Sequence, residues 1–244
     1  MTKDFGIIVR SAGGPEALEW SELETPAPAR GEALIAQRAI GVNFIDTYYR
    51  KGAYPWPMTP LIPGGEAAGV VEAVGEGVSD VKPGDRVAYI LPIGAYRTRR
   101  VVPAERLVKL PDSIEFDVAA SMMLKGLTTQ FLLTACYEVK SGDTVLVHAA
   151  AGGVGLLMGQ WLKAIGATAI GTVGSAEKGA IAVADLELFK FADTPEEAFD
   201  VLKAGLTENH LDSEHERKLE VEKVPAEPAP GVQEMLGPDI NRTR

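Results

Sequence analysis

Short apolar runs separated by glycine and proline occupy roughly the first 110 of the 244 residues. Runs of this kind, bounded by turn residues, are typical of strands in a β-rich barrel or sandwich. In the turn Lys82-Pro83-Gly84-Asp85, proline fixes φ at about −65° and glycine tolerates positive φ, as a type II turn requires. The pattern predicts an irregular β-rich first half with strands at 6–9, 32–39, 68–74, 86–90 and 96–102.

Longer apolar patterns begin after residue 113 and are typical of helices. Two helices are expected, one around 117–120 and one around 130–133. The stretch Lys125-Gly126-Leu127-Thr128 lies between them and is expected to separate them.

A strand, a loop and a helix follow. Val145-Leu146-Val147 is a short aliphatic run that leads into a loop of small residues and then into a helical pattern over 154–165. Gly166 is placed to end that helix. A second strand at 168–173 and a short helix at 176–184 are expected next.

The loop after the first of these strands carries the clearest chemistry. It reads Ala150-Ala151-Gly152-Gly153-Val154-Gly155, the G-x-G-x-x-G dinucleotide fingerprint with alanine at its first glycine position. Gly152 would let the backbone approach a pyrophosphate, and Gly155 would let the helix pack closely on the strand. Backbone N–H groups at the helix start then face the anion. The order of strand, loop, helix and strand favours cofactor binding over a glycine-rich turn of another α/β unit.

The end of the second strand indicates which dinucleotide binds. An NAD site usually has Asp or Glu there, about 20 residues after the loop, to bind the ribose hydroxyls. This chain has Gly174 and Ser175 at the strand tip and Lys178 one helical turn later. A neutral tip with a cation suits a 2′-phosphate, so we expect NADP(H). The alternatives are a serine cap beside a surface lysine, and a ribose contact from Glu177.

Composition and charge exclude several classes of protein. The net charge of −10 and the pI near 4.9 argue against a nucleic-acid-binding surface. The single cysteine, Cys136, excludes an internal disulfide framework and thiolate zinc clusters, and it suits a reducing cytoplasm. Neither a signal peptide after Met1 nor an apolar run of about 18 residues is visible, so we expect no secretion and no membrane-spanning helix.

The character of the chain changes near residue 185. Thr194-Pro195-Glu196-Glu197 is typical of a helix start, because it offers a cap, a proline at the first helical position and a capping box. We therefore expect a helical segment at 185–211. The remainder, 212–244, contains the proline-rich run Pro225-Ala226-Glu227-Pro228-Ala229-Pro230-Gly231 and is expected to be extended or disordered.

Five separate motifs resemble one protein family. They read VNFIDTYYRKGAYP, IPGGEAAGVVEAVGEGV, PGDRVAY, LKGLTTQFLL and VHAAAGGVG, and they occur in this order between residues 42 and 155. On composition alone, the first motif is expected to be a surface loop. Together the motifs resemble the zinc-independent quinone oxidoreductases, the zeta-crystallin-like branch of the medium-chain dehydrogenase/reductase superfamily. The resemblance runs from about Phe5 to about Ala182.

That resemblance implies a fold of mixed α+β and α/β class. A GroES-like β-rich catalytic domain would occupy 1–125, and an incomplete Rossmann NADP-binding domain would occupy 126–184. NADPH would bind in the cleft between them. The implied reaction is hydride transfer from NADPH to a quinone or another conjugated carbonyl. The implied partner is thus a small-molecule quinone or enone, with no nucleic acid and no membrane, and a homo-oligomer is left open.

The resemblance also implies roles for individual residues. Asn43 and Tyr54 would line the nicotinamide and substrate cleft, with Asp46 and Tyr48 close by in the catalytic set. Thr128 would lie near the cofactor phosphates at the start of a helix. The remaining cofactor-binding residues would be Gly152, Gly153, Val154 and Gly155 for the pyrophosphate, and Gly174, Ser175 and Lys178 for the 2′-phosphate.

Several of these residues have a purely structural alternative. Asp46 is also suited to cap a local turn. Tyr48 is also suited to a core position with its hydroxyl at the surface. His148, at the end of the strand before the glycine loop, is expected to be a core histidine with satisfied polar atoms rather than an acid or a base.

No metal is expected in the reaction. The zinc branch of the superfamily needs a cysteine and a His-Glu pair where this chain has Asn43 and Gly65-Glu66. One cysteine and three histidines cannot rebuild a zinc site of three or four ligands. A quinone is already electrophilic, so positioning the nicotinamide against it is the main requirement. No dedicated acid–base pair is identified.

The resemblance ends after Ala182, which leaves the function open. A Rossmann sheet has about six strands, and we expect only the first two here, with a long unpaired edge. The half that carries the glycine loop is therefore expected to be less stable than the β-rich half, or to pair with strands of a partner chain. One interpretation is a quinone oxidoreductase with impaired activity. The other is a non-enzymatic protein that binds a nucleotide or a partner weakly. A phosphoribohydrolase rests only on a short likeness within 185–211.

Overall fold

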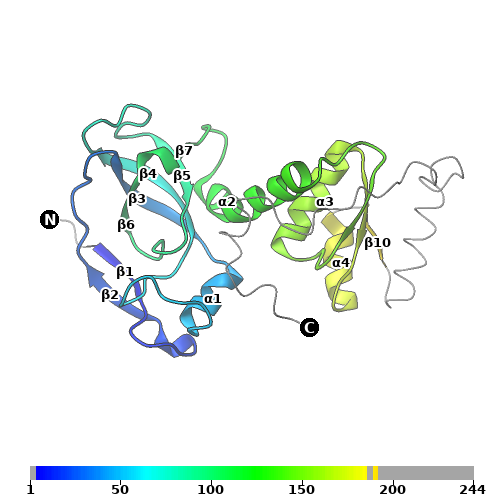
Figure 1. Ribbon diagram of the computed structural model, residues 1–244, viewed down its shortest axis with the longest axis horizontal. Coiled ribbons are helices and arrows are strands. Elements are labelled where there is room, and N and C mark those ends of the chain that lie inside the picture. The colour runs from blue at the N-terminus through cyan, green and yellow to red at the C-terminus, as the bar shows by residue number, and fades with distance from the viewer. Residues whose placement is uncertain (1–3, 186–188, 192–244) are drawn as a thin grey trace, which may run out of the picture.

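The computed structural model describes residues 4–185 and 189–191. Figure 1 shows a β-rich lobe and a smaller α/β lobe, joined by the helix α2 (Phe116–Gln130). α2 continues directly into η3 (Phe131–Cys136), a π-helical turn. The boundary expected after residue 125 falls inside this helix.

The prediction of two separate helices around 117–120 and 130–133 is wrong. Lys125-Gly126-Leu127-Thr128 lies within α2 and does not interrupt it. A glycine inside a helix costs only about 1 kcal/mol relative to alanine, which packing can offset. Here Ala119 and Ala120 of α2 are buried against Ala68 and Ala88 of the β-rich lobe. These small side chains let the helix lie close to the sheet.

A five-stranded antiparallel sheet organises the β-rich lobe. Its strand order is β6-β3-β4-β5-β7. The predicted strands at 32–39, 68–74 and 86–90 are confirmed to within two residues. The strands are β3 (Glu32–Gly41), β4 (Glu66–Val74), β5 (Arg86–Ile90), β6 (Arg99–Pro103) and β7 (Val108–Lys109), with η2 (Ala104–Arg106) between the last two.

A two-stranded antiparallel sheet packs beside the five-stranded one. It joins β1 (Asp4–Ile8) to β2 (Glu19–Leu23), with η1 (Pro15–Ala17) between them. The prediction of a strand at 96–102 is only partly right, because its first residues pair with β1 instead: the Ile7 N–H donates to the Tyr96 carbonyl at 2.8 Å. β2 and the two-residue β7 had no sequence signal, since β2 carries glutamates at an exposed edge.

The predicted turn at Lys82–Asp85 is confirmed. Gly84 has φ of +92°, and the Asp85 N–H donates to the Lys82 carbonyl at 3.0 Å. The turn leads directly into β5, whose residues Val87 and Tyr89 lie in the core of the lobe. That core is formed by small and β-branched side chains around Tyr89: Ala33, Ile35, Ala67, Val71, Val81, Val87, Ala95, Val102 and Ala104.

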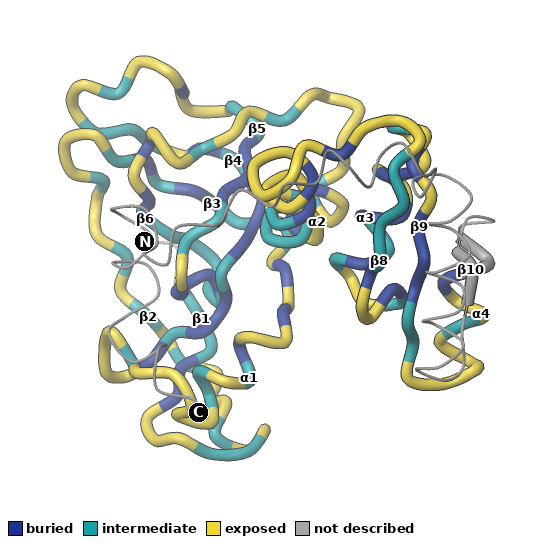
Figure 2. The backbone as a smooth tube through the Cα atoms, turned by 45° about the vertical axis from the view of Figure 1, so that its right-hand side comes forward, coloured by how far each residue is buried: buried dark blue, intermediate teal, exposed yellow. Residues whose placement is uncertain are grey.

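The α/β lobe is a small parallel sheet with helices. β8 (Thr144–Val147), α3 (Gly153–Ile165), β9 (Thr168–Gly171) and α4 (Ala176–Asp185) follow one another as expected. Gly166 ends α3 with φ of +84°, which confirms the predicted stop. Figure 2 shows β9 largely buried. The core of the lobe includes Leu133 of η3. The continuous segment α2–η3 therefore packs against the β-rich lobe through α2 and against the α/β lobe through η3.

The expectation of a two-stranded sheet is wrong. A third strand, β10 (Phe189–Phe191), pairs in parallel with β9, and the strand order is β10-β9-β8. The segment expected to be helical at 185–211 therefore contains a strand, which pairs with one edge of β9. The rest of that segment, including Thr194–Glu197, and all of 212–244 lie outside the described residues. The lower stability of this lobe stays a prediction.

Candidate dinucleotide site

The glycine loop sits where β8 meets α3, as the fingerprint requires. The Ala150 N–H donates to the Thr172 carbonyl at 3.0 Å, and the Gly152 N–H donates to the Ala149 carbonyl at 2.8 Å. These bonds turn the chain so that Gly152 caps α3 and the helix begins at Gly153. The first N–H groups of a helix lack partners within it and carry its positive dipole end. The loop is thus built to receive an anion.

Close backbone approach explains two of the glycines. A Cβ at Gly155 would lie 2.5 Å from the Ala149 carbonyl oxygen and 2.6 Å from that of Ala150. A Cβ at Gly152 would lie 3.0 Å from the Ala149 oxygen. Gly155 therefore permits the contact between α3 and the loop that a dinucleotide fingerprint needs. The residues present fit an NADP(H) pyrophosphate.

A hollow of about 430 Å³ opens beside this loop. It is lined by Gly152, Gly153, Val154 and Gly155 of the predicted set, with Leu132, Leu146, Val147, His148, Ala149 and Met158. His148 was expected in the core, but it is exposed, and its Nδ1 lies 3.0 Å from the Thr172 hydroxyl. It follows directly after β8, which is an edge strand of the described sheet.

Ala149 has φ of +54°, the left-handed region that an alanine rarely occupies. This conformation costs about 1 kcal/mol in alanine and little in glycine. We predict that Ala149→Gly raises the free energy of unfolding of the α/β lobe by about 1 kcal/mol, measured by urea denaturation. Ala150→Gly, at the neighbouring buried position without positive φ, is the control and should destabilise. Equal effects of the two changes would contradict this reading of the strain.

The predicted 2′-phosphate residues lie together at the end of β9. Gly174, Ser175 and Lys178 are all exposed, in the turn before α4 and in its first turn. The Lys178 N–H donates to the Ser175 hydroxyl at 3.3 Å. A hydrogen bond from Ser175 also lowers the pKa of Glu177. Ser175 therefore caps α4, which was the structural alternative, and the Lys178 side chain is exposed next to it. A phosphate role for the three residues stays a prediction.

The stretch expected to be a loop after β3 contains the helix α1 (Phe44–Arg50). A capping box starts it: the Asn43 side chain accepts from the Asp46 backbone, and the Asn43 N–H donates to the Asp46 carboxylate at 2.9 Å. The spacing Asn43-x-x-Asp46 was the sequence signal that could have predicted this helix. Asp46 thus fulfils its structural alternative as a cap.

Asp46 is buried, and burial raises the pKa of its carboxyl. Its Oδ2 also accepts a hydrogen bond from the Tyr96 hydroxyl at 2.9 Å. Burial, with the charge of Asp46, raises the pKa of Tyr96 well above its ordinary value. The hydrogen bonds from Asn43 and Tyr96 make this carboxyl hold the start of α1 in place. A catalytic role for Asp46 stays a prediction.

Two of the predicted cleft residues form an exposed aromatic cluster. Tyr48 and Tyr54 are 41% and 43% exposed, and their ring centroids lie 5.5 Å apart in an edge-to-face arrangement. Phe44 packs edge-on against Tyr48 with centroids 5.3 Å apart. Tyr48 is therefore at the surface and not in a core. The cluster offers apolar ring faces close to Asn43.

Sequence reasoning missed a polar network around Glu66, a fully buried carboxylate at the start of β4. The Asn43 amide donates to its Oε1 at 2.6 Å, and the Leu124 N–H donates to its Oε2 at 2.6 Å. The Lys125 ammonium lies 3.3 Å from Oε1 and 2.8 Å from the side-chain oxygen Oδ1 of Asn43. The network joins α1, β4 and α2, which are distant in the sequence.

Thr128 does not lie at a helix start. It is inside α2, and its hydroxyl donates to the Leu124 carbonyl one turn back, at 2.7 Å. The prediction that Thr128 starts a helix was wrong, because the two helices expected around 117–120 and 130–133 form one continuous segment. A contact between Thr128 and the cofactor phosphates stays a prediction.

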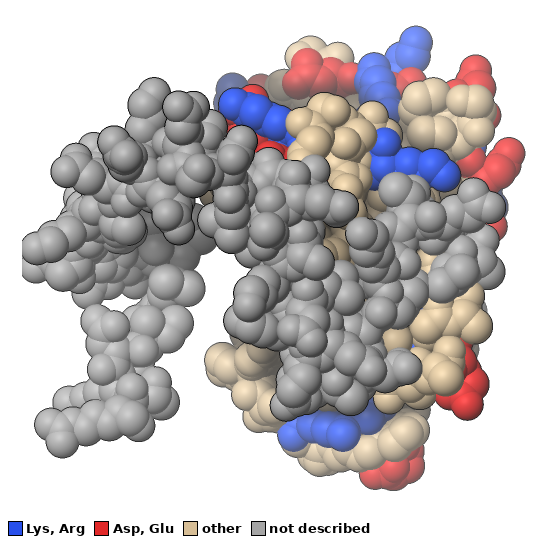
Figure 3. All heavy atoms as spheres, turned by 90° about the vertical axis from the view of Figure 1, so that its right-hand side faces the viewer, with Lys and Arg blue, Asp and Glu red and all other residues tan. Residues whose placement is uncertain are grey.

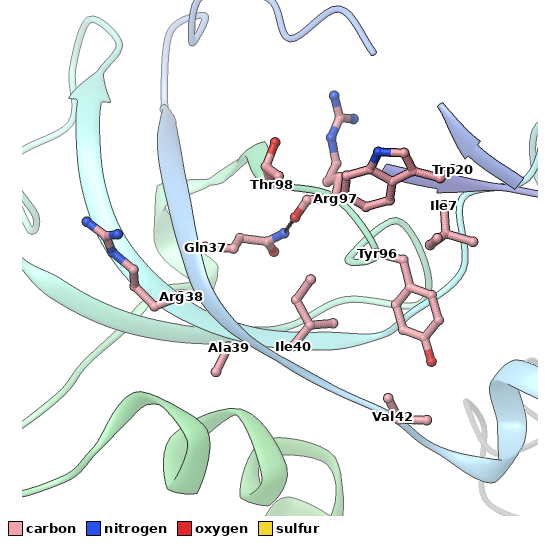
Figure 4. Close-up of a pocket in the computed structure, with 10 residues that line it drawn as sticks. All are labelled: Ile7, Trp20, Gln37, Arg38, Ala39, Ile40, Val42, Tyr96, Arg97 and Thr98. Carbon is pink, nitrogen blue, oxygen red and sulfur yellow. Dashed lines mark hydrogen bonds between the residues drawn. The ribbon is translucent and has the colours of Figure 1, made fainter. Parts of the chain in front are cut away.

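A second hollow, of about 340 Å³, lies on the β-rich lobe. Figure 4 shows Trp20, Ile7, Ile40 and Val42 around it, with Gln37 and Tyr96. None of the predicted site residues lines it. Of these two hollows, the glycine-loop hollow is therefore the one lined by predicted cofactor-binding residues.

The distribution of charged and metal-ligating side chains can be followed over residues 4–185 and 189–191. Figure 3 shows basic and acidic side chains interspersed on the described part of one face. In these residues no cluster of three or more His, Cys, Asp or Glu side chains is arranged to hold a metal ion. None of their helices is long and apolar enough to cross a membrane.

A β-rich lobe followed by a glycine-loop βαβ unit is the architecture of medium-chain dehydrogenases/reductases. Residues 29–112 match the alcohol dehydrogenase GroES-like domain. The chain is 55% identical over 171 residues to a quinone oxidoreductase of Pseudomonas aeruginosa, covering 70% of this chain and 53% of that protein. It is 50% identical over 167 residues to quinone oxidoreductase 1 of Escherichia coli, covering 68% of this chain and 51% of that protein. The chain belongs to the quinone oxidoreductase family.

Solved structures agree with this assignment. The quinone oxidoreductase of Pseudomonas syringae has a TM-score of 0.76 at 51% identity, covering 84% of this chain and 62% of that chain. The Escherichia coli quinone oxidoreductase complexed with NADPH has a TM-score of 0.78 at 42% identity, covering 82% and 63%. The chain spans about half the length of the curated relatives it matches.

Proposed function

We propose that this chain binds NADPH and reduces a quinone or another conjugated carbonyl by hydride transfer, without a metal. The main support is the glycine loop, where the absence of a side chain at Gly155 allows α3 to contact the loop backbone closely. A hollow of about 430 Å³ lies next to this loop. Family membership supports the proposal, because relatives are named quinone oxidoreductases and one was solved with NADPH.

Residues of both described lobes contribute to this function. NADPH, when bound, supplies the hydride. The first N–H groups of α3 bind the pyrophosphate, and Ser175 and Lys178 bind the 2′-phosphate. Asn43 binds at the nicotinamide end. The exposed rings of Tyr48 and Tyr54 line the space where a flat quinone stacks and exclude water from it.

The function is tested by titrating NADPH into the purified chain and following nicotinamide fluorescence. Saturable binding at micromolar concentration, with NADPH oxidation that depends on added quinone, is the expected result. Binding without oxidation would favour the second candidate, a non-enzymatic nucleotide-binding protein. No binding at near-millimolar NADPH would overturn the proposal.

The 2′-phosphate assignment gives a sharper prediction. Lys178→Ala should weaken NADPH binding about tenfold and leave NADH binding unchanged, because one charge-assisted hydrogen bond is lost. Lys163→Ala is the matched control, since Lys163 is also exposed but lies in the last turn of α3. Equal NADPH dissociation constants for the two variants would show that Lys178 does not contact the phosphate.

The proposal includes a small-molecule substrate and a cytoplasmic location. The single cysteine, Cys136, is free, which suits a reducing compartment. A homo-oligomer remains part of the hypothesis, and size-exclusion chromatography with light scattering would give the mass in solution.

A further inference from the structure

We propose that Lys125 is a positioning residue that holds Asn43 at a fixed distance from the glycine loop, so that one bound dinucleotide can contact both Asn43 and the loop. This inference deepens the proposed function and rests on it. No sequence pattern marked Lys125 for this role. The structure places it between the two ends of the candidate site.

The ammonium of Lys125 has all three of its N–H donors engaged. It donates to the side-chain oxygen Oδ1 of Asn43 at 2.8 Å, to the Ser121 backbone carbonyl at 3.2 Å and to Glu66 Oε1 at 3.3 Å. Its side chain is 23% exposed and Glu66 is fully buried. Such an arrangement fixes the position of the ammonium.

Asn43 is held from both ends of its amide. Its Nδ2 donates to Glu66 Oε1 at 2.6 Å, while its Oδ1 accepts from Lys125. Its backbone N–H is bonded to Asp46. The orientation of the amide is therefore determined by Glu66 and Lys125, together with the Asp46 backbone N–H that donates to the Asn43 side chain in the capping box. Removal of Lys125 would leave Oδ1 without the cation that holds it.

The stem of Lys125 lies against the glycine loop. A Cβ at Gly153 would be 2.7 Å from Lys125 Cδ and 2.9 Å from Cε. Gly153 is the first residue of α3, at the end where the pyrophosphate is expected. One side chain thus contacts the loop with its methylenes and Asn43 with its charged end. The separation of these two parts of the site is set by Lys125.

Fragment binding separates this role from a general loss of structure. In Lys125→Met, which keeps an apolar stem, the dissociation constant for NADPH should rise about tenfold. The dissociation constant for 2′,5′-ADP, which reaches only the α/β lobe, should stay within about twofold. Lys125→Arg, which keeps the cation, should recover part of the NADPH affinity. Lys140→Met, at an exposed lysine, is the matched control and should change neither constant.

Weakening of both ligands alike in Lys125→Met would overturn the proposal, as would unchanged NADPH binding. Hydrogen exchange of the free chain gives a readout that needs no cofactor. The Leu124 and Asp46 amides should exchange faster in Lys125→Met than in the parent, because the Glu66 and Asn43 network loosens. If the parent does not bind NADPH, the proposed function fails, and unchanged exchange would then reject the positioning role as well.

Discussion

Replacing Glu66 with alanine is expected to lower the free energy of unfolding by about 3 kcal/mol, the largest loss for a single carboxylate in the described part of the chain. Glu66 is fully buried and receives hydrogen bonds from Asn43, Leu124 and Lys125. Breaking a buried charged network by removing one partner costs about 3–5 kcal/mol, and the partial exposure of Lys125 places this case at the lower end. Urea denaturation of parent and variant measures the difference.

Glu72 is the matched control for this experiment. It lies on the same strand, β4, and pairs with Arg99 at 2.6 Å, but it is exposed. An exposed ion pair contributes about 0–1 kcal/mol. Glu72→Ala should therefore cost less than a third of the effect at position 66. Similar losses in the two variants would show that the Glu66 network contributes little to stability.

Gly155→Val is expected to lower the stability of the α/β lobe by about 3 kcal/mol and to abolish NADPH binding. Its Cβ would lie 2.5 Å from the Ala149 carbonyl oxygen and 2.6 Å from that of Ala150, so α3 would have to move away from the loop. Overpacking of this kind costs about 1–3 kcal/mol, and backbone atoms cannot yield as a side chain can. Thermal unfolding followed by circular dichroism, with an NADPH titration, measures both effects.

Gly174→Ala is the control in the same lobe. A Cβ at Gly174 meets no atom within 4 Å, and its φ is not positive. The variant should unfold within about 0.5 kcal/mol of the parent. If Gly155→Val had the same free energy of unfolding as Gly174→Ala, the close approach of α3 to the loop would not be needed for the fold.

Local patterns predicted most of the elements correctly. The glycine loop, the stop at Gly166 and the turn at Gly84 follow from the backbone freedom of glycine, which is a local property. Three central strands follow from β-branched runs between turns. The position of Gly174, Ser175 and Lys178 just after β9 could be predicted because the fingerprint fixes where the next strand must end, while their contact with a phosphate stays a prediction.

Errors occurred where distant residues decide the conformation. For α1 a local signal was overlooked, because the spacing of Asn43 and Asp46 already forms a capping box, and only the Tyr96 hydroxyl that also holds Asp46 comes from a distant part of the chain. α2 passes through Gly126 because alanines pack its face onto the sheet. β10 is a strand because it pairs with β9, which lies nearly 20 residues earlier.

The sequence by itself determined the class of this protein, since the glycine fingerprint and its neighbouring motifs are contiguous and act through local backbone geometry. Only the tertiary structure decided how the two halves of the candidate site are held together. Glu66 and Lys125 are 59 residues apart in sequence, yet they lie 3.3 Å apart in the fold. A buried charge needs a partner, and that partner can come from a distant part of the chain. A local sequence pattern therefore cannot predict this ion pair.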